Sequence, residues 1–296
     1  MTTTTAEGVV VVPKPESRAE RVVRWSAKAP VHVVLLLIGL LWIVPTFALF
    51  MISIFDPAKS ATEGWWRVFS DPSSATLDNY TALFNNSSMV HALIVTALVT
   101  LGATVLPVMI AALAGYAFAW IDFPGRDVIF ILIIGLLALP IQMALIPVFR
   151  LYNWTSLYDT ILGLILFHTA FSLPFSIFLL RNFFVGIPKD LMEAARIDGA
   201  GELRIFFRLI LPLGLPAVAS LAIFQVLFVW NDLLVGLTLA QDNQPIAATI
   251  SLQLRQFGSN LDIIAPAAFI SLVIPLTIFL AFQRYFVQGL LAGSVK

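Results

Sequence analysis

Six long apolar stretches constrain what this chain can fold into more than any other feature of its sequence. A transmembrane helix requires about 20 consecutive residues that are mostly apolar. The stretches that meet this requirement are residues 31–55, 90–119, 128–149, 160–180, 210–238 and 263–286. The composition agrees, because 59% of the residues are hydrophobic and 11% are charged, whereas soluble domains carry about 25% charged residues. The sequence therefore predicts an all-α integral membrane protein with six transmembrane helices.

Charge and cysteine content exclude several classes of function. The formal net charge is zero, which gives no support to a nucleic-acid partner. The chain contains no cysteine, so disulfides, thiolate metal sites and cysteine nucleophiles are excluded. The first apolar stretch is too long for a cleaved signal peptide, and we interpret it as a retained membrane anchor.

The distribution of basic residues predicts the orientation in the membrane. Thirteen of the 17 Lys and Arg residues lie in segments on one side of the predicted membrane, and four lie on the other. Because Lys and Arg concentrate in cytoplasmic loops, we expect both termini to be cytoplasmic. The predicted division is a cytoplasmic tail at 1–30, a first transmembrane helix at 31–55, an external segment at 56–89, a core of five transmembrane helices at 90–288 that includes the cytoplasmic segment 181–208, and a cytoplasmic tail at 289–296.

Two further patterns leave alternatives open. Residues 16–29 are basic and suit either a short helix on an anionic membrane surface or a simple positively charged flank of the first helix. Prolines recur within the apolar stretches, at positions 45, 107, 140, 147, 174, 212, 216, 266 and 275. They indicate either helices that kink or move around a path, or only the higher proline content of membrane helices.

The cytoplasmic segment between the fourth and fifth stretches is short, polar and interrupted by glycine. Pro188 fits a first helical turn, and Asp198-Gly199 predicts the end of that helix, because glycine readily takes the left-handed conformation that a helix end requires. The expected apolar side of this helix is Leu191, Ala194, Ala195 and Ile197. A second short helix, "ELRIFFRLI", leads into the fifth stretch. The two helices form either a compact knob that inserts into a groove of another subunit or an ordinary interhelical loop.

The sequence of this segment, "EAARIDGAGELRIFFRLILPLGLP", resembles the EAA signature of ATP-binding-cassette importer permeases over 24 residues. The matching positions are Glu193, Ala194, Ala195, Asp198, Gly199, Ala200, Phe206, Leu211, Pro212 and Pro216, while Leu209 stands where isoleucine is usual. The resemblance implies the type I importer-permease fold and a coupling helix that docks into a cleft of the ATP-hydrolysing subunit. It assigns that coupling role to Glu193, Ala194, Ala195, Asp198, Gly199, Ala200 and Phe206.

The resemblance extends over nearly the whole chain beyond residue 31. "YAFAWIDFPGRD", "LALPIQMALIPVFRLYN" and "VWNDLL" are similar to the maltose-type carbohydrate permeases, and "HTAFSLPFSIFLLRNFF" with "AIFQVLFVWNDLLVG" most resembles their α-glucoside branch. The resemblance implies a non-catalytic subunit in a bacterial or archaeal cytoplasmic membrane. Its implied partners are a second, homologous permease, an ATPase dimer and an extracytoplasmic solute-binding protein, which would contact either 56–89 or 240–262. The chain has no G-x-x-x-x-G-K-[ST] motif, so ATP and Mg would be bound by the partner ATPase. The resemblance implies no cofactor in this chain itself.

Polar groups within apolar stretches are costly, and they are therefore candidates for a solute path. The candidates are Gln142, Gln225, Phe228, Trp230, Asn231 and Asp232, because amides, carboxylates and aromatic rings suit the hydroxyl edges and apolar faces of sugars. Alternatively, Trp230, Asn231 and Asp232 pack against the partner permease, or Asp232 only ends a helix. His168 is isolated in the sequence and is more typical of a packed residue than of a metal ligand.

Two other functions compete with the importer subunit. An ion-coupled secondary transporter for a small polar solute would need intramembrane ionisable residues, and only Asp232 is a candidate. An intramembrane hydrolase is remote, because no paired aspartates, serine–base pair or histidine pair occurs in the stretches. An importer subunit, unlike either alternative, should be inactive without a separate ATPase.

Overall fold

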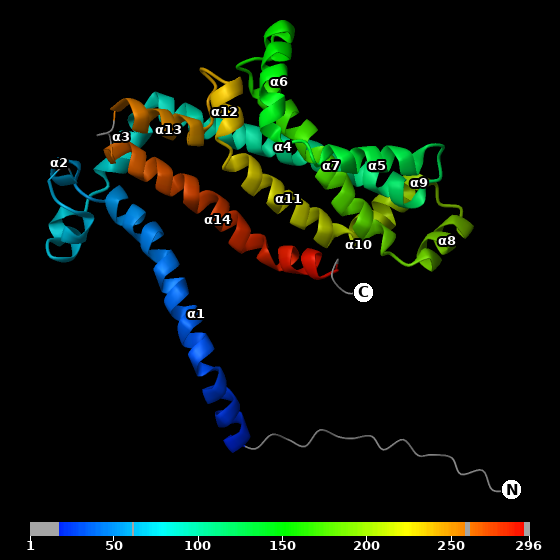
Figure 1. Ribbon diagram of the computed structural model, residues 1–296, viewed down its shortest axis with the longest axis horizontal. Helices are drawn as coiled ribbons and strands as arrows, with labels where there is room; N and C mark the ends of the chain where they lie inside the picture. Colours follow the sequence, from blue (N-terminus) through cyan, green and yellow to red (C-terminus); the bar gives the residue numbers. More distant parts are fainter. Residues whose placement is uncertain (1–17, 61, 258–260, 293–296) are drawn as a thin grey trace. The chain divides into compact units, whose positions relative to one another are not determined.

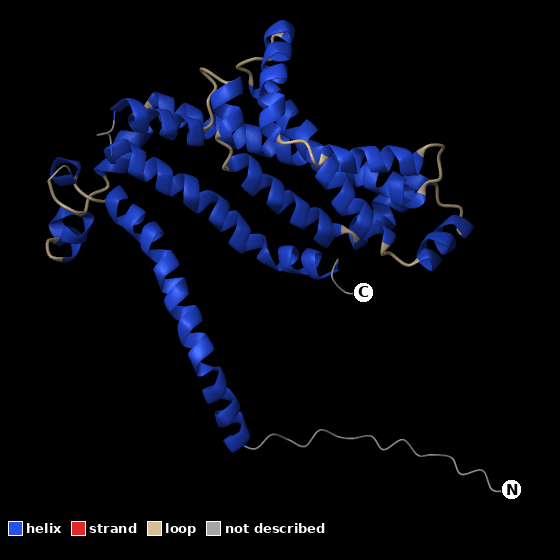
Figure 2. Ribbon diagram, in the orientation of Figure 1, coloured by secondary structure: helices blue, strands red, loops and turns tan. Residues whose placement is uncertain are grey.

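The computed structural model of the protein describes residues 18–60, 62–257 and 261–292. All regular elements in these residues are helices, and the only β feature among them is an isolated bridge between Phe55 and Ala75 (Figure 2). The all-α prediction is therefore confirmed. Residues 1–17 of the predicted N-terminal tail and 293–296 of the C-terminal tail lie outside the described residues.

The chain divides into two compact units, residues 1–48 and 49–296. The first unit contains most of α1 (Arg18–Ser53), a single helix that passes through Pro30 and Pro45 without interruption. Residues 18–29 therefore continue directly into the first predicted span as part of one helix.

Four helices are long and apolar enough to cross a membrane, and two bent helix pairs could each add one crossing. The four are residues 30–53 of α1, α4 (Ser87–Trp120), α7 (Ile161–Val185) and residues 261–284 of α14 (Leu261–Ala292). The bent pairs are α5 (Arg126–Leu136) with α6 (Ile141–Thr155), at 97°, and residues 202–213 with α11 (Leu215–Trp230), at 74°. The count of four to six crossings is consistent with the six predicted.

The stretches 128–149 and 210–238 are thus not continuous helices, and local chemistry explains each break. Pro140 lacks a backbone N–H and keeps the preceding residue out of the helical region, so α5 ends before it and α6 starts after it. The other pair bends at Gly214, between α10 (Leu211–Leu213) and α11, with Pro212 and Pro216 on either side. The remaining prolines of the apolar stretches lie inside uninterrupted helices. Proline alone therefore does not decide where these helices break.

The core of the second unit is built from α4, α7 and α11, with α14 packed on α11 (Figure 1). Gly115 of α4 lies against α7 so closely that a Cβ there would be 3.0 Å from the backbone nitrogen of Arg181 and 3.2 Å from the Cβ of Leu180. Small residues allow such close approach between membrane helices, where packing rather than hydrophobic burial drives association. Helix α5 lies along α7, and α6 projects away from them after the 97° bend (Figure 1).

Short helices make up the segments that were predicted to be external. The first segment contains α2 (Pro57–Ser60), two 3₁₀ helices (Trp65–Phe69 and Pro72–Ser74) and α3 (Asp78–Asn85). The buried side chain of Asn79 in α3 joins this segment to the end of α1. Its Nδ2 donates hydrogen bonds to the carbonyl oxygens of Ser53, at 3.1 Å, and Phe55, at 2.8 Å. The second segment follows α12 (Leu234–Leu239) and contains α13 (Ile246–Phe257).

Asp159 ties the turn before α7 to the turn between α12 and α13. It adopts a positive φ of 57°, and its Oδ1 accepts hydrogen bonds from the backbone N–H groups of Gln241 (2.8 Å), Asp242 (3.0 Å) and Asn243 (2.9 Å). The side-chain amide of Asn243 returns a bond to the Asp159 carbonyl oxygen at 2.7 Å. Partial burial acts to raise the pKa of the Asp159 carboxyl, but these backbone bonds outweigh it and hold the pKa below its ordinary value.

We expect Asp159→Ala to destabilise the protein by about 1 kcal/mol, because three backbone N–H groups lose a charged acceptor that water replaces only in part. Since the pKa is lower in the folded protein, the stabilisation is present above the unfolded-state pKa and is lost as pH falls through the folded one. Thermal unfolding of detergent-solubilised protein as a function of pH measures both effects. Asp242→Ala is the matched control, because that variant keeps the backbone donor. Equal destabilisation by the two variants, or an unchanged pH dependence in Asp159→Ala, would contradict this role.

Candidate coupling site and solute path

The first candidate site is the pair of short helices in the predicted cytoplasmic segment. Helix α8 (Lys189–Ile197) follows Pro188, which has an extended ψ of 133°, and α9 (Glu202–Ile205) follows Gly201. Gly199 has a φ of +75°, and its N–H bonds to the carbonyl oxygen of Arg196, while the N–H of Ala200 bonds to that of Ala195. This pair of bonds around a left-handed glycine is the Schellman ending of a helix. The predicted end of the helix at Gly199 is therefore confirmed.

The exposure of the segment differs from the predicted pattern. Met192 is the buried residue of α8, whereas Ile197 is 85% exposed and Leu191 is also exposed. Of the expected apolar side, Ala195 is partly buried and packs on the core with Met192, whereas Leu191, Ala194 and Ile197 are exposed. The physical reason is that Met192 and Ala195 are three residues apart and share one face of this short helix, which is the face that meets the core. Ile197 is consequently free to meet a partner.

The seven predicted coupling residues divide into an exposed group and a buried one. Exposed or partly exposed are Glu193, Ala194, Ala195, Asp198, Gly199 and Ala200. Phe206 is buried, and its ring packs against that of Tyr116 of α4 with centroids 5.4 Å apart. It lies in a single turn of π-helix (Phe206–Ile210) between α9 and α10. Phe206 therefore anchors the segment to the body of the protein, while the other six residues lie on or beside its free surface.

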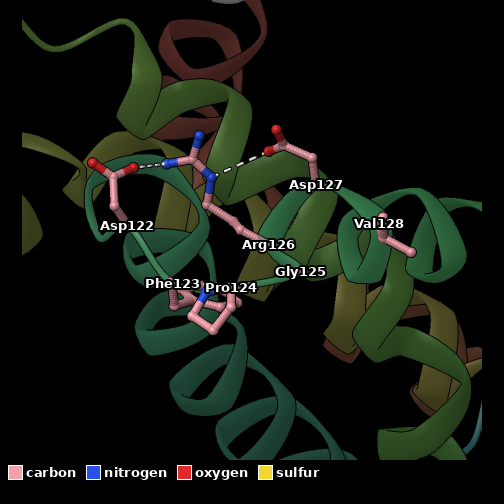
Figure 3. A pocket seen from close by; sticks show the side chains of 7 residues that line it. All are labelled: Asp122, Phe123, Pro124, Gly125, Arg126, Asp127 and Val128. Atoms are coloured by element: carbon pink, nitrogen blue, oxygen red, sulfur yellow. Dashed lines mark hydrogen bonds and ion pairs between the residues drawn. The ribbon is translucent and has the colours of Figure 1, made fainter.

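A shallow pocket of about 520 Å³ lies nearby, in the loop between α4 and α5. Figure 3 shows the side chain of Arg126 between the carboxylates of Asp122, in the loop, and Asp127, in the first turn of α5. The guanidinium donates to Asp122 at 2.6 Å and to Asp127 at 3.1 Å. Because its positive charge is already shared by two aspartates, this loop offers little to an anionic ligand.

The second candidate site lies at the other end of α11. Helix α11 has 16 residues, which corresponds to a length of about 24 Å, and it starts near the coupling segment and ends at Trp230. The side chain of Asp232 accepts hydrogen bonds from the backbone N–H groups of Val235 (3.0 Å) and Gly236 (3.3 Å), at the start of α12. Its Oδ2 also lies 3.9 Å from the Nε2 of buried His168. Asp232 thus caps the start of one short helix and at the same time faces α7.

The other predicted path residues occupy different environments. The ring of Phe228 is exposed and meets the edge of the His168 ring, with centroids 6.3 Å apart. Trp230 is buried, and its indole N–H donates to the Ser271 carbonyl oxygen of α14 at 2.9 Å. Asn231 is exposed and lines a pocket of about 490 Å³ between α11, α13 and α14. The structure therefore brings Phe228 and Asp232 together at His168, and it gives Trp230 a packing contact.

Two glutamines complete the predicted set. Gln225 is buried in α11, and its Nε2 has no hydrogen-bond partner among the described residues. Gln142 is exposed in the first turn of α6 and belongs to a different element from the others. Sequence reasoning missed the contacts of His168 with Phe228 and Asp232, because no spacing within α7 points to a partner on α11. No group of three His, Asp or Glu side chains that could hold a metal occurs in the part of the chain that the structure describes.

Comparison with known proteins identifies the protein family, and the matched part of the chain contains both candidate sites. Residues 108–291 match the family described as the binding-protein-dependent transport system inner membrane component. The chain belongs to this family. As an inner membrane component of a transport system, it is a non-catalytic, multi-pass permease subunit. The predicted resemblance to importer permeases is confirmed, and dependence on a binding protein decides against the self-sufficient secondary transporter and the hydrolase.

Individual relatives of this permease support the same class. It is 45% identical to the osmoprotective compounds uptake permease protein GgtD of Synechocystis sp., over 91% of this chain and 92% of the relative. It is 44% identical to the alpha-glucoside transport system permease protein AglG of Rhizobium meliloti, over 78% of this chain and 63% of the relative. The permease also shares its fold with one chain of a bacterial ABC transporter that imports the acidic polysaccharide alginate, with a TM-score of 0.74 and 22% identity over 92% of this chain and 99% of that chain.

Proposed function

We propose that this permease forms half of the translocation path of an ATP-powered, binding-protein-dependent importer, and that α8 is its coupling helix. The observation that carries the proposal is an exposed, rigidly ended helix, whose Ile197 is 85% exposed, in a chain that lacks a nucleotide-binding motif. An exposed isoleucine at the end of the helix that carries the EAA signature suits insertion into an apolar cleft of another subunit, where its side chain would be removed from water. The partner that supplies ATP hydrolysis would then be a separate ATPase dimer, which binds ATP and Mg.

The proposed substrate is a carbohydrate, specifically an oligosaccharide such as an α-glucoside. The name of AglG and the sequence similarity to the α-glucoside branch support this substrate, whereas GgtD is named for osmoprotective compounds. A competition experiment distinguishes these two substrate classes. It measures how far unlabelled α-glucosides, and separately osmoprotectants, reduce the uptake of a labelled α-glucoside. The proposed solute path comprises Gln142, Gln225, Phe228, Trp230, Asn231 and Asp232.

The proposed topology places both termini in the cytoplasm and counts each bent helix pair as one of six crossings of the cytoplasmic membrane. The corresponding segments are a tail at 1–30, a first crossing at 31–55, an external segment at 56–89, a permease core at 90–288 with the coupling segment at 181–208, and a tail at 289–296. A second, homologous permease would complete the path, and an extracytoplasmic binding protein would deliver the solute to 56–89 or 240–262. ATP-driven closure of the ATPase dimer would draw the two coupling helices together and favour the outward-open state. Because this coupling is reciprocal, the loaded binding protein should in turn favour ATP binding.

Substitution of Ile197 tests this proposal directly. We expect Ile197→Glu to reduce the ATPase subunit that purifies with the tagged permease by about tenfold, since a carboxylate would have to be desolvated in an apolar cleft. Its high exposure means that the change removes little packing within the permease itself. The measurement is the ratio of ATPase subunit to permease after mild-detergent purification from the native host.

Ile197→Leu is the matched control and should retain the ATPase, and both variants should retain the second permease. An unchanged ratio in Ile197→Glu would show that α8 is not the docking element. If the unmodified permease carries no ATPase subunit, the importer proposal itself fails.

A further inference from the structure

Three side chains and one backbone carbonyl form a hydrogen-bonded bracket between the coupling segment and the end of α4. The Tyr116 hydroxyl of α4 donates to Oε2 of Glu202 in α9. Nε of Arg196 in α8 donates to Oε1 of the same carboxylate at 3.1 Å, and another nitrogen of that guanidinium donates to the Trp120 carbonyl oxygen at 3.1 Å. We call Tyr116, Trp120, Arg196 and Glu202 the Glu202 bracket. It joins α8, α9 and α4 through one carboxylate.

The bracket is attached to buried structure on the side of α4. Tyr116 is buried, and its ring packs against Phe206. The indole N–H of Trp120 donates to the Phe184 carbonyl oxygen near the end of α7 at 3.0 Å. Both ends of the bracket on α4 are therefore fixed to the helix core, whereas α8 contributes only one buried side chain, Met192. The side chains of Arg196 and Glu202 are 42% and 43% exposed, and exposed ion pairs add little stability, so the bracket links an otherwise lightly packed helix to α4 without contributing much to the stability of the fold.

Helix α4 connects this bracket to the opposite end of the bundle. It runs without interruption from Ser87 to Trp120 and packs on α7 and α11. Thr96, which lies 20 residues before Tyr116 and thus about 30 Å away along the helix, accepts a hydrogen bond from the backbone N–H of Ile246 at 2.7 Å. Ile246 starts α13, in the second segment that was predicted to be external. One helix and one hydrogen bond therefore connect Tyr116 to the start of α13.

We propose that Glu202 is a positioning residue that transmits displacement of α8 to α4, and so couples the ATPase to the opening of the path. The inference rests on the function proposed above and extends it to Tyr116 of α4 and to Arg196 and Glu202, which are not among the matching positions of the EAA signature. Glu202 does not need to touch the ATPase, because both of its carboxylate oxygens are already bonded within the permease, to Tyr116 and Arg196. The glutamate carboxylate is required because one side chain must accept from both Tyr116 and Arg196.

Glu202→Gln distinguishes transmission of displacement from α8 to α4 from binding of the ATPase to α8. Glutamine keeps the size of the side chain but loses the charge that pairs with Arg196. In the reconstituted transporter we expect normal recovery of the ATPase subunit and basal ATP hydrolysis that is not reduced. Stimulation of hydrolysis by the loaded binding protein, and uptake itself, should each fall roughly fivefold or more, within the range of allosteric coupling factors. A purely structural role for Glu202 would lower all four quantities together.

Two further variants make the test specific. Tyr116→Phe removes the other partner of Glu202, and its loss of stimulation should not add to that of Glu202→Gln, since both act through one link. Asp127→Asn is the matched control, because this 78% exposed carboxylate at the start of α5 pairs with Arg126 and not with the bracket. It should leave stimulation unchanged.

The proposal is overturned if Glu202→Gln keeps normal stimulation, or if its uptake falls only in proportion to the ATPase subunit that it retains. Additive losses in the Tyr116→Phe and Glu202→Gln double variant would also contradict a single link. Absence of binding-protein stimulation in the unmodified transporter is a different outcome. It would refute the importer function rather than the role of Glu202 alone.

Discussion

Gly199→Val should release the ATPase subunit and lower uptake on the order of 100-fold, near the upper end of measured allosteric coupling. Gly199 has a φ of +75° and ends α8 through the bonds that its own N–H and that of Ala200 make. A β-branched residue is a genuine outlier in this left-handed region, where even an ordinary L-residue costs about 1–2 kcal/mol. The segment should relieve this strain by changing its turn, and the exposed residues of α8 would then no longer present the same surface.

The effect of Gly199→Val comes from backbone strain and not from a clash, because a Cβ at this position meets no atom within 4 Å. Gly199→Asn is therefore a matched control, since asparagine tolerates the left-handed conformation better than other residues with a side chain. It should retain most of the ATPase and of the uptake. Equal losses in the two variants would indicate that side-chain volume at the docking surface matters, and that the conformation of Gly199 does not.

Gly163→Ala should destabilise the permease by about 3 kcal/mol, the high end of the usual cost of overpacking. A methyl group at this buried position in the first turn of α7 would overlap the Leu157 carbonyl oxygen and lie 3.0 Å from Oγ1 of Thr160. That carbonyl is backbone and cannot rotate away, and it also accepts a hydrogen bond from Thr160 at 2.7 Å. The Tyr152 hydroxyl donates to the Gly163 carbonyl oxygen at 2.9 Å, so the whole turn between α6 and α7 would have to shift.

The apparent melting temperature in detergent, followed by intrinsic fluorescence, measures this loss for Gly163→Ala. Gly135→Ala is the matched control, because Gly135 lies inside α5 and a Cβ there meets no atom within 4 Å. It should be neutral or slightly stabilising, since alanine favours a helix by up to about 1 kcal/mol over glycine. A similar melting temperature for Gly163→Ala and the unmodified protein would show that the turn accommodates the methyl group.

Much of the fold could be predicted from the sequence because it depends on local properties. Hydropathy over about 20 residues identifies helices that suit lipid, and it located α1, α4, α7 and α14. The end of α8 at Gly199 could be predicted because glycine is the residue that adopts a positive φ without strain. The same reasoning failed for 128–149 and 210–238, because prolines occur both at the breaks and inside continuous helices such as α4 and α7.

The candidate sites show the same division. The proline and glycine pattern of the cytoplasmic segment correctly predicted two short helices around Gly199, but the side of α8 that packs on the protein depends on how Met192 fits the core. Likewise, Asp232 could be chosen as a candidate from the sequence because it is a charged residue near the end of an apolar stretch. The 3.9 Å distance between its Oδ2 and the Nε2 of His168 could not be predicted in this way. Each of these contacts depends on where a different helix lies.

The sequence thus determined that this chain is a helical membrane protein with a glycine-ended knob and no nucleotide-binding motif. Tertiary structure decided which residues of that knob are free and how it is attached to the rest. Tyr116 and Glu202 are 86 residues apart, and Asp159 is 84 residues from Asn243. Such contacts depend on how whole helices pack, because hydropathy and backbone preferences act over a few neighbouring residues and carry no information on which distant segments will meet.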